Sequence, residues 1–240
     1  MKLDKFPTVQ NAVRFYDPDP QVVRRKFVAF AKSKPPFSYN DLRKLIRQSY
    51  GLHQDLPTLE NTIRLGVLRA YVREKYLEIL PLLRQYIDQQ KPTYVQSLGH
   101  SLTYPAGRGL FVTVDPPFVI GTSIGAVIPW ISFWKHNPLT PTQMALLCAM
   151  IRSVLQQEAD LDGAVLQFVD LSVPKGATDR ILRVQDLRSV ESLGNAQVTS
   201  MLETLHTGME LAEGDLAGLP QSDSTPSPQS DTDSNQLKLL

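Results

Sequence analysis

The chain has 240 residues, and its 25 Lys and Arg side chains nearly cancel its 24 Asp and Glu side chains, which leaves a formal net charge of +1. This balance excludes a uniformly basic nucleic-acid coat and a uniformly acidic solvating chain. The charge is unevenly placed, because residues 1–108 hold 18 basic and 9 acidic side chains, a net +9, whereas residues 109–240 hold 7 and 15, a net −8. Two halves of opposite charge are therefore the first feature to explain.

Other features of the composition narrow the class of protein. Hydrophobic residues make up 42% of the chain, which is enough for a substantial core. The single cysteine, Cys148, excludes an intramolecular disulfide framework, and its apolar surroundings predict a buried small hydrophobe. The chain does not open on a signal-peptide pattern, and no segment approaches the ~20 apolar residues of a membrane span. We therefore expect a soluble, cytoplasmic protein without a membrane partner.

The basic half is predicted to be helical. After an extended or turn-like lead-in that ends with the acidic and proline residues 17–20, apolar residues recur at helical spacing over Gln21–Lys34 and over Tyr39–Tyr50. A third and longer helix begins near Thr58. Pro81 falls inside its pattern, and the sequence leaves open whether this proline bends the helix or divides it.

Beyond residue 93 the chain becomes rich in β-branched and aromatic residues, which favour strands. Gly121 and Gly125 are spaced as in a hairpin connection, and Pro116-Pro117 predicts a bend or a sheet edge. The strands are expected at Leu110–Val114, Phe118–Ile120, Ala126–Trp134, Val165–Leu171 and Arg180–Gln185.

Two helices are expected among these strands. Thr140 is the predicted cap of a helix over Thr142–Glu158, and a second helix is expected over approximately residues 196–213. The whole pattern predicts an α/β or α+β protein in three parts. These are a basic helical region of about three helices (1–92), a mixed β-sheet core flanked by helices (93–213) and a polar, disordered tail (214–240).

The chemical motifs of common enzyme classes are missing. The sequence contains no P-loop, no Gly-x-Gly-x-x-Gly after a strand, no His-Glu-x-x-His pair and no Gly-x-Ser-x-Gly elbow. Its four histidines are scattered singly along the chain, which is not the spacing of a metal site. The motifs therefore predict no cofactor, and the protein is not expected to be an enzyme.

The order of elements nevertheless follows a known arrangement. A basic helix carrying Glu74 precedes the strands Leu110–Asp115 and Ala126–Lys135, which are followed by the helix Thr142–Glu158 and the strand Val165–Leu171. This order resembles the αβββαβ core of the PD-(D/E)XK nuclease superfamily, over about residues 70–172 and in topology alone.

The resemblance implies three catalytic candidates and a Mg²⁺ cofactor. Asp115 matches the acid at the end of the family's second core strand, Lys135 matches the lysine of its acid-x-Lys triplet, and Glu74 lies on the preceding helix. Phe133 stands where the triplet has its acid, so a hard cation would lack a ligand there. The resemblance thus implies the fold without the chemistry. The plainer interpretation is a turn residue for Asp115 and solvated surface positions for Lys135 and Glu74.

The basic half suggests a function of its own. Helices with a basic face can lie across a phosphate backbone, so we expect a non-catalytic nucleic-acid-associated protein. The candidate phosphate contacts are Arg24, Arg25, Arg43, Lys44, Arg47, Arg64, Arg69 and Arg73. Two alternatives remain open. In the first, the basic side chains only solvate helix surfaces or dock on the acidic half. In the second, the protein is an assembly factor that binds a protein partner or a second copy of itself. A divergent metal-dependent nuclease is a weaker alternative.

Overall fold

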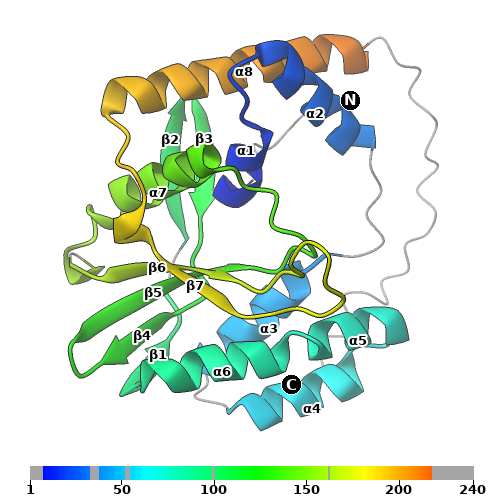
Figure 1. Ribbon diagram of the computed structural model, residues 1–240, viewed down its shortest axis with the longest axis vertical. Helices are drawn as coiled ribbons and strands as arrows, with labels where there is room; N and C mark the ends of the chain where they lie inside the picture. The colour runs from blue at the N-terminus through cyan, green and yellow to red at the C-terminus, as the bar shows by residue number, and fades with distance from the viewer. Residues whose placement is uncertain (1–7, 33–37, 52–54, 99–100, 162, 218–240) are drawn as a thin grey trace.

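A five-stranded mixed sheet lies across the middle of the molecule, with helices on both of its faces (Figure 1). The computed structural model describes residues 8–32, 38–51, 55–98, 101–161 and 163–217. In spatial order the strands are β1 (Tyr94–Gln96), β4 (Val119–Thr122), β5 (Gly125–Ser132), β6 (Val165–Asp170) and β7 (Arg183–Asp186). Only β5 and β6 pair in parallel among these neighbours. The predicted α/β class is confirmed.

The basic half forms more helices than the sequence predicts. The described helices before the sheet are α1 (Val9–Phe15), α2 (Pro20–Lys32), α3 (Asn40–Gly51), α4 (Leu56–Gly66), α5 (Ala70–Leu77) and α6 (Leu80–Gln90). The expected lead-in is confirmed at residues 17–19 as a non-helical, bent stretch before α2, whereas α1, which precedes it, is not predicted by the sequence. The long helix is divided near Pro81, one of the two outcomes that the sequence leaves open, and it is divided again near Val67, which the sequence does not predict. Val67 leaves helical geometry after Gly66, and Pro81 lies in the first turn of α6, where a missing backbone N–H is tolerated.

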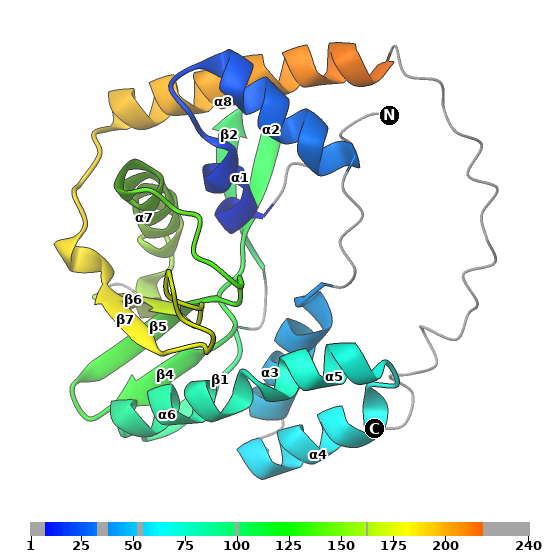
Figure 2. The same ribbon diagram turned by 45° about the vertical axis from the view of Figure 1, so that its right-hand side comes forward.

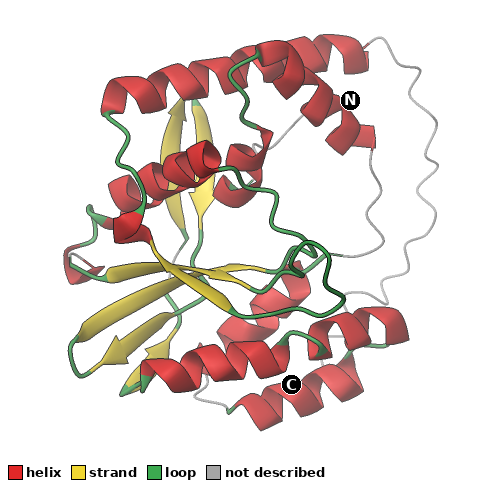
Figure 3. Ribbon diagram, viewed as in Figure 1, coloured by secondary structure: helices red, strands yellow, loops and turns green. Residues whose placement is uncertain are grey.

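The stretch Leu110–Ile120 is divided between two sheets. Strand β3 (Leu110–Val114) pairs with β2 (Leu102–Gly107) in a separate two-stranded sheet, and Pro116-Pro117 leads from it to β4. The expected bend at these prolines is confirmed, whereas the placement of Leu110–Asp115 in the main sheet is wrong. Figure 3 shows the β2–β3 hairpin standing apart from the five-stranded sheet. The hairpin between β4 and β5 is found as predicted.

Two helices complete the acidic half. Helix α7 (Pro141–Leu155) crosses from β5 to β6. Thr140 caps its start as predicted, and it does so in a capping box with Gln143. Helix α8 (Asn195–Ala217) packs against α2, which runs obliquely to it in both views (Figures 1 and 2). Because α8 continues to Ala217, the predicted tail does not begin at Gly214, and its remainder from residue 218 lies outside the described residues. Short 3₁₀ turns occur at Ala159–Leu161 and Leu187–Ser189.

The sheet separates two apolar cores, because side chains alternate between its faces. Trp130 and Phe168 point toward α1, α2, α7, α8 and the β2–β3 hairpin, where Cys148 is buried as expected. Ile131 and Val169 point toward α3–α6. The helices of the basic half therefore lie on both sides of the sheet. In the described part of the chain no helix is long and apolar enough to cross a membrane.

Candidate functional site

Several predicted phosphate contacts are already paired with carboxylates. Arg24 donates from Nε and Nη2 to the two carboxylate oxygens of Asp215, each over 2.6 Å. Arg64 donates to Glu60 on its own helix, and Lys44 lies 3.9 Å from the Asp41 carboxylate. The charge of these side chains is therefore partly neutralised within the protein.

The other outlying candidates do not extend a single basic face. Arg25 is exposed on α2, on the opposite side of the sheet from α3–α6. Arg69 is exposed before α5, and Arg73 donates to the carbonyl oxygen of Val67. The structure thus distributes these side chains over separated surfaces.

Arg43 and Arg47 do converge, on the face of α3 that meets the end of β5. The Arg43 guanidinium lies 5.6 Å from the centroid of the Phe133 ring, and its Nη2 donates to Gln10 Oε1 of α1 over 2.7 Å. Arg47 lies one turn further along α3 and pairs with Asp115, with Nη2 2.5 Å from Oδ1. One helix therefore brings two guanidinium groups to the carboxyl end of β5.

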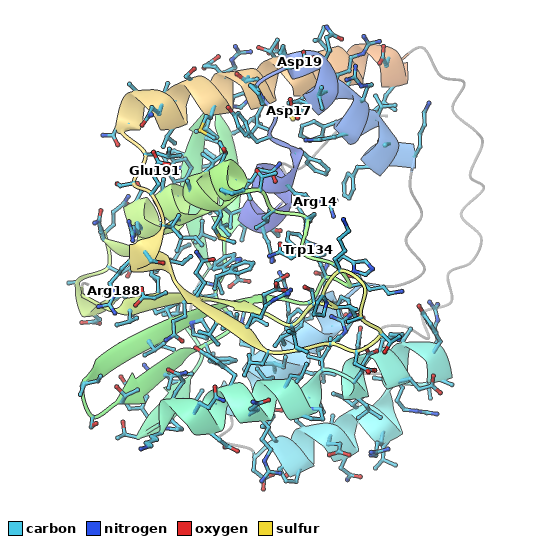
Figure 4. All side chains as sticks on the ribbon, in the orientation of Figure 1. Arg14, Asp17, Asp19, Trp134, Arg188 and Glu191 are labelled. Carbon is cyan, nitrogen blue, oxygen red and sulfur yellow. The ribbon has the colours of Figure 1, made fainter. Side chains whose placement is uncertain are left out.

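A third arginine reaches the same strand end from the other core. The guanidinium of Arg14, at the end of α1, lies 5.6 Å from the centroid of the Trp134 ring, and Figure 4 shows the two side chains between α1 and the sheet. The next residue, Lys135, is exposed. We call Arg14, Arg43, Arg47 and Lys135 the basic cluster.

The electrostatics of the basic cluster favour an anion. Burial lowers the pKa of Arg14, and burial also lowers the pKa of Arg43, where nearby Asp115 and Arg47 act in opposite directions. Within the described ranges, no carboxylate oxygen lies within 4 Å of the Arg14 or Arg43 guanidinium. A charge held partly out of water and not in direct contact with a carboxylate is costly, and an anionic ligand reduces that cost.

The catalytic candidates of the nuclease resemblance are not brought together. Asp115 is bound to Arg47, Lys135 is exposed, and Glu74 is exposed on α5. None of the hydrogen bonds or ion pairs among the described residues joins two of them. No group of three or more His, Cys, Asp or Glu side chains that could hold a metal ion occurs in that part of the chain either. Since Asp115 faces a cation and Phe133 offers no oxygen ligand, these residues do not fit Mg²⁺.

Known proteins give no further guide. No family model, curated protein or solved structure matches this chain.

Sequence reasoning missed the residue that positions the cluster. The Arg180 side chain is 3% exposed and donates from Nη1 to the carbonyl oxygens of Phe133, Trp134 and Leu171. It also reaches Tyr39 Oη and Glu78. Arg180 thus fixes the backbone that carries both aromatic rings under Arg43 and Arg14. A lone arginine after Asp179 gives no local signal of this role.

Proposed function

We propose that the protein binds nucleic acid without acting on it chemically, and that Arg14, Arg43 and Lys135 of the basic cluster contact the phosphate backbone. The observation that carries the proposal is the placement of Arg14 and Arg43 over Trp134 and Phe133. Two helices from different cores deliver these guanidinium groups to adjacent residues at one strand end. An arginine already ordered on a ring loses less conformational entropy on binding, and its planar group matches a phosphate bidentately.

The contrast with arginines elsewhere supports this location. Arg24, Arg64, Arg108 and Arg188 each donate to a carboxylate at 2.5–2.6 Å. A phosphate at those positions would have to compete with an internal acid. At Arg14 and Arg43 the described residues provide no such competitor, so phosphate binding is least opposed there.

Fluorescence anisotropy with a labelled DNA duplex tests the proposal. Binding is expected at micromolar protein in ~50 mM salt and should weaken steeply by ~200 mM salt. Arg14→Gln and Lys135→Gln should each weaken binding uniformly across sequences and reduce the salt slope by ~1. Arg188→Gln is the matched control, because Arg188 is exposed and paired with Asp186.

Two results would contradict the proposal. One is the absence of any binding in ~50 mM salt, since the electrostatic contribution is largest there. The other is Mg²⁺-stimulated cleavage of the duplex that is lost in Asp115→Ala, which would contradict the non-catalytic part and restore the nuclease alternative.

A second candidate function is self-association with no nucleic-acid role. Three large apolar side chains are exposed around the connection between α4 and α5, namely Leu65 (75%), Leu68 (65%) and Tyr71 (54%). Exposed apolar side chains that occur together often mark an interface. Sedimentation velocity over a range of concentrations should then show a dimer that Leu68→Ser abolishes and Ile124→Ser, at an exposed hairpin turn, retains. A monomer at every concentration would exclude this candidate.

A further inference from the structure

A small cavity lies between α3 and the end of β5. Its volume is about 10 Å³, and its walls include Arg43, Arg47, Asp115, Trp130 and Phe133. Such a volume holds one particle of about the size of a water molecule. The cavity is therefore large enough for a single small ligand and too small for a polyatomic one unless its walls move.

Two of the side chains that wall the cavity carry buried donors without an acceptor. Arg47 Nε and Trp130 Nε1 are both buried, and neither has a hydrogen-bond partner among the described residues. The same is true of Nε2 of Gln10, whose Oε1 accepts from Arg43. Each of these nitrogens can only donate. A buried donor left unpaired costs about 1–3 kcal/mol, so three of them around one arginine pair indicate a missing acceptor.

The charge of the walls favours an anion over water. A water molecule would need acceptors for its own two hydrogens, as well as donors to it. The carboxylate at the wall, that of Asp115, binds Arg47 through Oδ1, and it can still accept from a water molecule through its second oxygen. The two guanidinium groups at the wall favour a ligand that carries negative charge. Ser132 Oγ, the fourth unpartnered buried atom in the described part of the chain, lies on β5 two residues after Trp130 and can serve either role. The N–H groups at the wall thus suit a ligand that only accepts.

Charge and size then define the ligand. Two guanidinium groups face one carboxylate at this wall, which leaves one positive charge uncompensated there. We propose that the cavity binds one monoatomic anion, of which chloride is the natural member. An oxyanion such as phosphate is larger than this volume. The inference goes beyond nucleic-acid binding, because it concerns the buried side of the arginines and requires no nucleic acid.

The bound anion has a structural consequence. It accepts hydrogen bonds from α3 and β5 at once, and therefore joins the helix layer to the sheet at the strand end that carries Phe133 and Trp134. A ligand that binds the folded state alone stabilises it in proportion to its occupancy. Chloride should thus raise the melting temperature Tm saturably, in the absence of any nucleic acid.

The experiment exchanges sodium gluconate for sodium chloride at constant ionic strength and records the Tm of the full chain. The wild type should show a saturable rise, and Trp130→Phe, which removes the indole N–H at the cavity, should abolish it. Trp134→Phe removes the other indole N–H, outside the cavity, and should retain the rise. An equal Tm in both salts, or an equal rise in Trp130→Phe, would overturn the proposal.

Bromide in crystals of the wild type provides a test that needs no variant. Its anomalous signal is expected within hydrogen-bond distance of Arg47 Nε and Trp130 Nε1, and a site without that signal would overturn the proposal. A rise in Tm with phosphate and none with chloride would also overturn it, because the ligand would then be an oxyanion. Arg14→Gln weakens nucleic-acid binding but leaves the chloride response intact, so the two proposals can fail separately.

Discussion

Arg24 and Asp215 join positions 191 residues apart through two hydrogen bonds of 2.6 Å each. The pair connects α2 of the basic half to α8 of the acidic half. Arg47 with Asp115 and Arg108 with Glu203 join the same two halves elsewhere. The charge asymmetry of the sequence is therefore explained in part by ion pairs within the molecule, which join basic side chains of residues 1–108 to acidic side chains of residues 109–240.

The Arg24–Asp215 pair should make a small, pH-dependent contribution to stability. The hydrogen bond from Arg24 lowers the pKa of Asp215 in the folded protein. The stability that the pair contributes is therefore complete above the ordinary carboxyl pKa of ~3.9. It is lost as the pH falls through the lowered pKa of the folded state. We expect Asp215→Asn to lower Tm slightly near neutral pH, and the difference from wild type to vanish in acid and in high salt. Glu213→Gln, on the same helix, is the control. A difference that persists in acid would contradict the assignment to this pair.

Gly208 allows α8 to approach α2 closely. A Cβ at this position would collide with the Val23 side chain and come within 2.9 Å of the Pro20 carbonyl oxygen. Gly208→Ala should therefore lower the free energy of unfolding by about 1–3 kcal/mol, as overpacking does. Gly214→Ala, in the same helix with no atom within 4 Å, should be neutral or stabilise by up to about 1 kcal/mol. Urea unfolding of both variants measures the contrast, and equal effects would contradict the close approach.

Local signals in the sequence were sufficient where a single element carries them. Thr140 and the apolar run after it define α7, and the nearly continuous apolar run of β6 matches a strand enclosed between β5 and β7. Sequence patterns do not predict the strands that form only by pairing with a distant segment of the chain. Strand β1 has only three residues, and β2 contains Pro105, so neither has the pattern of an independent strand.

The same distinction holds for the candidate site. Arg43 and Arg47 are four residues apart, so their common face on a helix could be predicted from spacing alone. Their neighbours could not, because Asp115, Gln10 and Trp130 reach them only through tertiary packing. Arg14 is not among the predicted candidates because it lies in α1. The prolines that follow α1 favour a non-helical lead-in, so the sequence does not predict this helix. Which acid neutralises which arginine is a property of the fold, and it decides where an anion can bind.

Arg180 should be among the most important single side chains for stability. Replacing it with methionine keeps the apolar stem but leaves the buried carbonyl oxygens of Phe133 and Leu171 without their donor. We expect Arg180→Met to lower the free energy of unfolding by about 3–5 kcal/mol in urea titrations. Arg188→Met, at an exposed ion pair, should have little effect. The proposed nucleic-acid binding should also weaken in Arg180→Met under conditions in which the variant remains folded. A change in the free energy of unfolding of under about 0.5 kcal/mol would contradict the structural role of Arg180.

Tyr76 should make the protein sensitive to alkali. Its side chain is 1% exposed, its hydroxyl donates to the Ser38 carbonyl oxygen over 2.7 Å, and burial raises its pKa to about 12. The unfolded tyrosine loses its proton near pH 10, so the stability that Tyr76 contributes is complete below that pH and is lost as the pH rises through the folded value. The difference between the folded and unfolded pKa corresponds to about 2–3 kcal/mol of stability. Urea unfolding between pH 9 and pH 12 should therefore show a steeper decline in wild type than in Tyr76→Phe. Equal slopes in wild type and Tyr76→Phe would show that this hydroxyl is not held in its neutral form by the fold.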